Sequence, residues 1–142
     1  MRMDTARERP SGSSKPLSRP VSVLVIDDEV DTRELLAVVL EKAHYTVVTA
    51  ADGGGALGLL QTVRPDLIIL DLQMPGLDGA HFREQQRRNA EWIRIPTIVL
   101  TGSNEESQLD PGIALTLRKP VKASELLGIV ARYSGPADRR SS

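Results

Sequence analysis

Acidic side chains, a threonine and a lysine stand at or close to the ends of short apolar segments of this sequence. In chain order these groups are Asp27, Asp28, Glu29, Asp71, Thr101 and Lys119. Carboxylates that lie close together repel one another, and burial raises the cost of that repulsion. A hard divalent cation relieves the repulsion, and a ligand set made only of oxygen atoms suits Mg2+. If the fold brings these segments together, the acidic groups therefore predict a magnesium site.

The lysine and the threonine indicate what such a site would bind. Lys119 would add a fixed positive charge and Thr101 a hydroxyl donor, which together suit a small group with several anionic oxygens. Phosphoryl is the natural candidate for that group. A carboxylate that attacks phosphorus forms an aspartyl-phosphate, while the metal ion and the lysine neutralise the developing charge.

Each of these groups also has an ordinary structural interpretation. An Asp-Asp-Glu run before a helix is most often an N-cap whose charges favour the helix dipole. Asp71, which precedes Met74-Pro75-Gly76, could simply start a turn, and Lys119 could be a solvated surface lysine. Thr101 could do no more than end a strand. For any one group the ordinary interpretation is the commoner one, but their placement at successive segment ends favours a shared site.

The apolar segments have the pattern of β-strands. Val21–Ile26, Leu67–Leu70 and Ile95–Leu100 are short and rich in branched residues, which is typical of strands buried on both faces. Tyr45–Ala50 is a fourth predicted strand, and Ala114–Leu117 is a weaker fifth.

The segments between the strands have helical spacing. In Val30–Ala43 the apolar side chains recur on one stripe, and most charged side chains lie elsewhere. Ala56–Thr62, Ala80–Asn89 and Ala123–Arg132 are the other predicted helices. Strict alternation predicts a (βα)5 α/β fold, with a parallel sheet and helices on both faces. The carboxyl ends of such strands share one edge, where an open α/β sheet places its site, so the polar groups should converge there.

The composition fits a single globular domain and excludes several functions. The chain has 142 residues, and no cysteine is available for a disulfide or a thiolate metal site. A net charge of −1 and an aromatic content of 3% argue against a direct nucleic-acid partner. No apolar run approaches the roughly 18 residues of a membrane span, so we expect no membrane insertion.

The two ends of the sequence differ from its middle. Residues 1–20 are rich in proline, serine and cations, and they lack the apolar core of a signal peptide. We therefore expect a cytoplasmic protein. We divide the chain into a flexible tail at 1–20, a folded domain at 21–133 and a second flexible tail at 134–142.

Four motifs in this arrangement resemble a known family. VLVIDDE, PDLIILDLQMPGLDG, IVLTG and RKP stand in the order of the receiver domain of bacterial two-component response regulators, which has the CheY-like fold. Their separations match that family with one exception, and the resemblance runs from about Val21 to Tyr133. It implies a doubly wound, flavodoxin-like sheet of five parallel strands in the order 2-1-3-4-5.

The resemblance implies a set of metal ligands. Asp28 would bind Mg2+ directly, and Asp27 would help through bound water. Asp71 would contribute a carboxylate oxygen, and the backbone carbonyl of Gln73 would supply a further ligand.

It also implies roles in phosphoryl transfer. Asp71 would be the phosphoacceptor, Thr101 would bond one phosphoryl oxygen, and Lys119 would pair with another. The peptide between Lys119 and Pro120 is often cis in this family. The domain would be no conventional enzyme, since it would catalyse only its own phosphoryl acceptance and slow dephosphorylation.

Two features depart from the family's pattern. The position three residues before the lysine is usually an aromatic residue that swings inward on activation, and here it is Thr116. The stretch from Thr101 to Gly112 is also shorter than usual, by about one helical turn. Within it, SNEESQLDP at residues 103–111 has a single apolar residue, Leu109. We therefore expect a shortened or irregular fourth helix.

The leading hypothesis is a signalling module with no attached effector. It would receive a phosphoryl group from a histidine kinase or phosphotransfer protein and then change its affinity for an unidentified protein, and a homodimer remains open. A second hypothesis is a phospho-independent scaffold, which Thr116 and the altered fourth helix favour.

Two further functions are less well supported. A phosphatase with an aspartate nucleophile is opposed by the absence of a DxD pair at the first strand and of a cap domain. A DNA-binding regulator is not expected, because no effector domain follows residue 133.

Overall fold

A sheet of five parallel strands forms the centre of the molecule. The computed structural model describes residues 19–74, 78–102, 112–134 and 138–139. The strands of this sheet are β2 (Ser22–Ile26), β3 (Thr46–Ala50), β4 (Leu67–Asp71), β5 (Thr97–Thr101) and β6 (Leu115–Arg118). They lie in the order β3-β2-β4-β5-β6, and every neighbouring pair is parallel. Numbered along the chain this is 2-1-3-4-5, which confirms the predicted fold class and strand order.

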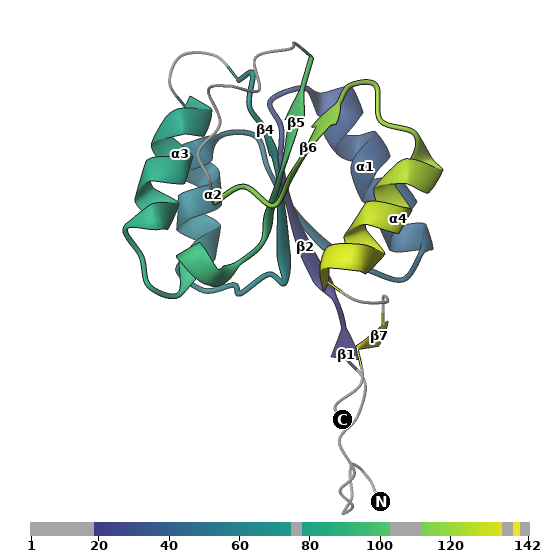
Figure 1. Cartoon of the computed structure of the whole chain (residues 1–142), viewed down its shortest axis with the longest axis horizontal. Coiled ribbons are helices and arrows are strands. Elements are labelled where there is room, and N and C mark those ends of the chain that lie inside the picture. The colour runs from purple at the N-terminus through teal and green to yellow at the C-terminus, as the bar shows by residue number, and fades with distance from the viewer. Residues whose placement is uncertain (1–18, 75–77, 103–111, 135–137, 140–142) are drawn as a thin grey trace, which may run out of the picture.

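Helices cover both faces of the sheet (Figure 1). Helices α1 (Val30–Lys42) and α4 (Ala123–Ser134) lie on one face, and α2 (Gly53–Leu60) and α3 (Asp78–Arg87) lie on the other. A 3-10 turn, η2 (Trp92–Arg94), precedes β5 and was not predicted. The predicted irregular fourth helix falls at residues 103–111, outside the described residues.

Some element boundaries differ from the predictions for local reasons. Strand β5 begins at Thr97, two residues later than predicted, because Pro96 has no N–H to pair with a neighbouring strand. Helix α2 begins at Gly53, before the predicted start at Ala56. Its N-cap is Asp52, whose carboxylate accepts the N–H of Gly55 at 2.6 Å. The helix contains four glycines, which have low helix propensity, so propensity alone does not indicate a helix start at Gly53.

Helix α1 ends in a left-handed residue. His44 has a φ of 74°, a conformation that non-glycine residues rarely adopt. The N–H groups of His44 and Tyr45 donate to the carbonyls of Glu41 and Leu40 at 2.9 and 3.0 Å. This is a Schellman motif, which turns the chain sharply into β3.

Strand β4 is the most deeply buried element. Leu67 and Ile69 face the core beneath α1 and α4, whereas Ile68 and Leu70 face the core beneath α2 and α3. Side chains alternate between the faces of a strand, so a strand covered on both sides must be apolar throughout. This burial fixes the position of Asp71, which ends the strand.

A buried glutamine fastens α3 to the chain that leads into β5. Gln86 is fully buried, and its Nε2 donates to Thr97 Oγ1 and to the carbonyl of Trp92, both at 3.0 Å. Its Oε1 accepts from Nη1 of Arg83 at 2.6 Å. These hydrogen bonds hold the start of β5 against α3, and Thr101 is at the other end of the same strand.

The two ends of the folded domain lie together at the amino edge of the sheet (Figure 1). Arg19–Pro20 (β1) and Asp138–Arg139 (β7) form an antiparallel pair of two residues each, which the sequence did not indicate. The remaining residues of the predicted tails are outside the described ranges, apart from Ser134 in α4. Within those ranges, no helix combines the length and the apolar character needed to cross a lipid bilayer.

Candidate active site at the carboxyl edge

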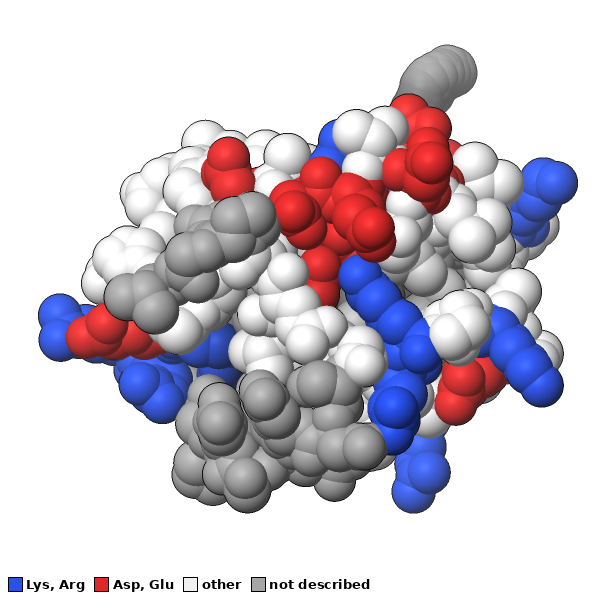
Figure 2. Space-filling view, turned by 90° about the horizontal axis from the view of Figure 1, so that it is seen from above, with Lys and Arg blue, Asp and Glu red and all other residues white. Residues whose placement is uncertain are grey.

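The polar groups that follow the strands converge at the carboxyl edge of the sheet. Asp27 follows β2, Asp71 ends β4 and Thr101 ends β5, and these three side chains are 0%, 2% and 3% exposed. Lys119 follows β6 and closes the set. Figure 2 looks down on this edge and shows acidic side chains gathered beside basic ones. The parallel sheet thus brings together groups that are far apart in the sequence.

Three carboxylates form a tight cluster here. Oxygen atoms of Asp27, Asp28 and Asp71 lie within 4.8 Å of one another. Asp27 and Asp71 are buried, whereas Asp28 is exposed. Asp27 Oδ1 accepts the N–H of Glu29 at 2.9 Å, and this bond fixes the carboxylate at the start of α1.

Lys119 is shared among three acidic partners. Its Nζ lies 3.2 Å from Asp27 Oδ2, 3.3 Å from Asp71 Oδ2 and 3.5 Å from Glu29 Oε1. Partial burial alone would lower the pKa of Lys119, but the negative charges of Asp71 and Asp27 outweigh it, so the pKa is raised. The ammonium group is therefore charged at neutral pH.

The pKa of Asp71 is raised by some of its surroundings and lowered by others. Burial raises the pKa of its carboxyl group, and the nearby charge of Asp27 raises it further. A hydrogen bond from the N–H of Gln73 to Asp71 Oδ1, at 3.0 Å, and the ammonium of Lys119 act in the other direction. The net pKa lies above the ordinary value for aspartate. Burial is the main cause of this raised pKa, and the negative charge of Asp27 adds to it.

The donor set fits a hard cation. Oδ2 of Asp27 is buried and, among the described residues, makes no hydrogen bond of acceptable geometry, although it lies 3.2 Å from Lys119 Nζ. A buried carboxylate oxygen without a hydrogen-bond donor is costly unless a cation offsets it. Together with the clustered oxygens of Asp28 and Asp71, it offers the all-oxygen environment that Mg2+ prefers.

An open cavity lies over the Asp71 carboxylate. It has a volume of about 280 Å3 and is lined by Asp28, Glu29, Asp71, Gln73 and Lys119. Thr101 ends the strand beside β4 but is not among the residues that line the cavity. A phosphoryl group attached to Asp71 would project into this space.

Two side-chain contacts at the site were not predicted, although Glu29 was expected to lie there. The side chain of Glu29 binds Lys119 and also accepts a hydrogen bond from Thr32 Oγ1 at 3.0 Å. The side chain of Gln73, for which only the backbone carbonyl was assigned a role, accepts the N–H of Gly102 at 2.7 Å. The position of Glu29 directly after Asp28 was the one available signal for the first contact.

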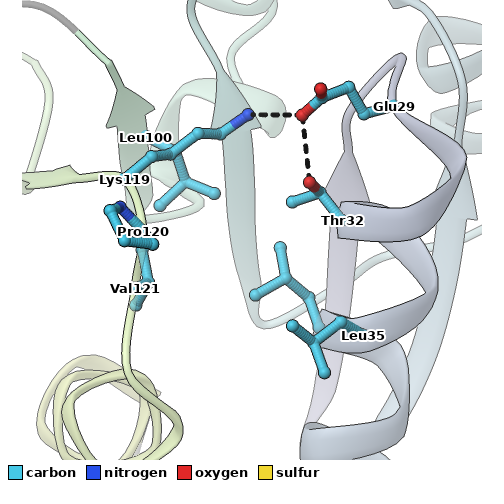
Figure 3. A pocket seen from close by; sticks show the side chains of 8 residues that line it. Glu29, Thr32, Leu35, Leu100, Lys119, Pro120 and Val121 are labelled. Atoms are coloured by element: carbon cyan, nitrogen blue, oxygen red, sulfur yellow. Dashed lines mark hydrogen bonds and ion pairs between the residues drawn. The ribbon is translucent and has the colours of Figure 1, made fainter.

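An apolar hollow of about 360 Å3 adjoins the site between α1 and the residues that follow β6. Leu35, Leu36, Leu100, Pro120 and Val121 line most of it, and Figure 3 shows Glu29 and Lys119 closing its upper end. These two charged residues also line the cavity over Asp71, so the two spaces are neighbours.

The departure at Thr116 is visible in the structure. Thr116 lies within β6, half-buried, opposite Val99 of β5. The Lys119–Pro120 peptide is cis, as the resemblance implies. The backbone N–H of Lys119 donates to the carbonyl of Thr101 at 2.8 Å, which ties the ends of β5 and β6 together.

Sequence comparison finds long relatives that share this domain. PhoB, a phosphate regulon transcriptional regulatory protein of Pseudomonas aeruginosa, is 35% identical over 124 residues, which are 82% of this chain and 54% of PhoB. Response regulator MprA of Mycolicibacterium vanbaalenii is 39% identical over 112 residues, which are 76% of this chain and 48% of MprA. The chain therefore spans about half the length of the curated relatives it matches.

Some solved structures of similar length are matched along almost their whole chain. Chemotaxis response regulator CheY4 of Vibrio cholerae has a TM-score of 0.74 and 31% identity, over 81% of this chain and 99% of CheY4. The receiver domain of sensor histidine kinase PA1611 from Pseudomonas aeruginosa has a TM-score of 0.75 and 28% identity, over 82% and 99%. That structure holds a magnesium ion in its active site cleft. The family model of the response regulator receiver domain matches residues 23–131, and this chain belongs to that family.

Proposed function

We propose that this chain is a phosphorylation-controlled receiver in which Asp71 accepts the phosphoryl group. Receiver domains are phosphoryl acceptors, and both phosphorylation and Mg2+ binding are typical of the family. One observation carries the assignment to Asp71. Its buried carboxylate lies between a second carboxylate and a lysine, beneath a cavity that opens to solvent.

Four groups would hold the metal ion. These are the carboxylates of Asp27, Asp28 and Asp71 and the backbone carbonyl of Gln73, with Asp28 as a direct ligand and Asp27 acting through bound water. When bound, Mg2+ would offset the carboxylate charges and the charge that develops on the transferred group. The hydrogen-bond-poor Oδ2 of Asp27 supports this arrangement.

The transfer itself needs little from the protein beyond position and charge. An Asp71 oxygen attacks phosphorus as the bond between phosphorus and the donor's histidine nitrogen breaks, and the electron pair of that bond stays on the imidazole. Lys119, held in its charged form, pairs with a phosphoryl oxygen, and the Thr101 hydroxyl donates to another. Slow hydrolysis of the aspartyl-phosphate, with no other substrate, would complete the chemistry.

Mass spectrometry tests the assignment directly. The protein is incubated with Mg2+ and acetyl phosphate, and a gain of one phosphoryl group is expected in the wild type. Asp71→Asn keeps the shape of the side chain but removes the nucleophile, so the gain should vanish. Asp66→Asn is the matched control, because Asp66 precedes β4 at the opposite edge of the sheet. Full labelling of the Asp71→Asn protein would assign the phosphoryl group to another residue.

The proposal includes a kinase upstream and a protein downstream. Receiver domains interact with histidine kinases or phosphotransfer proteins, and we propose that the phosphorylated domain changes its affinity for a protein partner. A cytoplasmic location, typical of such domains, is part of the same proposal. The proposal includes no direct contact with nucleic acid. Fluorescence anisotropy with random duplex DNA, with and without beryllofluoride, should therefore show no binding, and salt-sensitive binding would contradict that claim.

A phospho-independent scaffold is the second candidate. Thr116 favours it, because this side chain is too small to act as the inward-turning ring of relatives. The complete set of carboxylates, threonine and lysine at one edge opposes it. A wild-type protein that gains no phosphoryl group in the mass measurement would favour the scaffold.

A further inference from the structure

The side chain of Gln73 makes a contact at the site that the proposed phosphoryl transfer does not use. Gln73 is the second residue after Asp71, and Gly102 is the first residue after Thr101. The Oε1 atom of Gln73 accepts the N–H of Gly102 at 2.7 Å, while the N–H of Gln73 donates to Asp71 Oδ1 at 3.0 Å. One residue therefore binds both the acceptor carboxylate and the chain that leaves β5.

The N–H of Gly102 is well placed to serve a phosphoryl group. Leu100 pairs with Asp71 across the β4–β5 ladder, so Thr101 and Gly102 extend past the carboxylate at the open edge. A phosphoryl group brings additional acceptor oxygens into the cavity that Gln73 lines. Backbone N–H groups are effective donors to such oxygens because they are already oriented. In this structure that donor is occupied by the carboxamide of Gln73.

We propose that the carboxamide of Gln73 competes with a phosphoryl oxygen on Asp71 for the N–H of Gly102. The inference rests on the proposed phosphoryl acceptance and adds a regulatory residue to that site. Gln73 is exposed, so its displaced carboxamide is solvated and the protein gives up about one net hydrogen bond. Gln73 is thus a positioning residue that acts through Gly102. When its carboxamide is displaced, the hydrogen bond between Gln73 and Gly102 is lost.

The contact can be broken from either side. Gln73→Ala removes the acceptor and leaves the backbone carbonyl of residue 73 in place. Gly102→Ala keeps the N–H but places a Cβ 2.8 Å from Gln73 Oε1, closer than real Cβ atoms approach. Apart from the chain neighbours of Gly102, the carboxamide of Gln73 supplies the only described atoms within 4 Å of that Cβ, and the Gly102 backbone is not left-handed. The added methyl should therefore expel the carboxamide with little other strain.

Two remote substitutions provide matched controls. Gly58→Ala adds a methyl group to α2 where nothing lies within 4 Å. Gln61→Ala truncates an exposed glutamine at the end of the same helix. Neither residue touches the site, so neither should change the binding of a phosphoryl mimic.

The test is titration with beryllofluoride at saturating Mg2+, followed by calorimetry. Gln73→Ala and Gly102→Ala should each bind the mimic roughly two- to tenfold more tightly than wild type, the range expected when one net hydrogen bond no longer has to be given up. The double variant should match the single variants, because both remove the same contact. Mg2+ affinity is measured separately for each protein, so that every titration with the mimic is made at saturating Mg2+ and a change at the metal site is not taken for a change in mimic binding.

Exchange of the Gly102 amide reports on the contact with Gln73 separately from the overall stability of the protein. In the metal-free protein, the Gly102 amide should exchange faster in Gln73→Ala than in wild type, with unchanged urea midpoints showing that both proteins are folded. Unchanged exchange would mean that the contact does not persist in solution and would overturn the inference.

The outcomes separate this inference from the proposed function. A wild-type protein that binds no beryllofluoride refutes phosphoryl acceptance, and the inference fails with it. Wild-type binding with no gain in either variant refutes the competition alone, as do gains that add in the double variant. Weaker binding by Gln73→Ala also refutes it, because the carboxamide would then be a ligand of the phosphoryl group.

Discussion

Gln86 provides a quantitative test of how the structure positions β5. In Gln86→Leu the side chain keeps its approximate volume but loses all of its hydrogen bonds. The two backbone carbonyls that it serves would keep a partner, because Trp92 O also accepts from the N–H of Ile95 at 3.1 Å and Ile95 O accepts from Thr97 Oγ1 at 3.2 Å. The main loss is the bond from Arg83, a charged donor that is only 4% exposed. A charge-assisted bond contributes about 1.5–3 kcal/mol, and the remaining amide bonds contribute about 1 kcal/mol.

Gln86→Leu should therefore lower the free energy of unfolding by about 2.5–4 kcal/mol. Urea denaturation measures this, with the fluorescence of Trp92, the single tryptophan, as the probe. Gln85→Leu changes the adjacent, partly exposed glutamine and should have less than about a quarter of the effect. A loss below about 1 kcal/mol in Gln86→Leu would refute the account.

Three further predictions concern the site and its frame. Asp28→Ala should weaken Mg2+ binding by roughly tenfold or more, as judged by calorimetry, because a direct ligand matters at least as much as an outer-shell partner; unaltered affinity would exclude Asp28 as a ligand. The raised pKa of Asp71 means that the protonated carboxyl stabilises the metal-free fold, and that this stabilisation is lost as the pH rises from about 4 through the raised value. Asp71→Asn should therefore become increasingly more stable than wild type over that interval in urea denaturation with EDTA, and a constant difference would contradict the shift. His44→Gly should raise the free energy of unfolding by about 1 kcal/mol, because glycine adopts the positive φ without strain, and a thermal midpoint at or below that of wild type would count against it.

The sheet and its central site were predictable because burial controls the sequence there. A strand covered on both faces must be apolar throughout, so Leu67–Leu70 could be recognised, and Asp71 at its end could be placed. Alternation of strands and helices then fixed the edge at which the acidic groups meet. The assignment of individual ligands came from the family resemblance and not from these patterns.

The contacts that were missed depend on distances between loops. The bond between Gln73 and Gly102 joins residues 29 positions apart, and no local pattern indicates which loop ends approach each other. The pairing of Arg19–Pro20 with Asp138–Arg139 has the same origin, since neither dipeptide is a strand by composition. Helix α2 was started too late because glycine content outweighed the N-cap at Asp52.

Lys119 is shared among several carboxylates, so negative charge exceeds positive charge around this ammonium group. The carboxylates of Asp27, Asp28, Glu29 and Asp71 surround one ammonium group, so the metal-free site attracts cations and repels anionic phosphodonors. The electric field of these charges is screened over about 10 Å at 0.1 M ionic strength. The Mg2+ affinity should therefore fall as monovalent salt is added, and a value measured in dilute buffer will exceed the one that applies at cellular ionic strength. The same field favours an order of events, in which an anionic donor approaches easily only after a divalent cation has arrived.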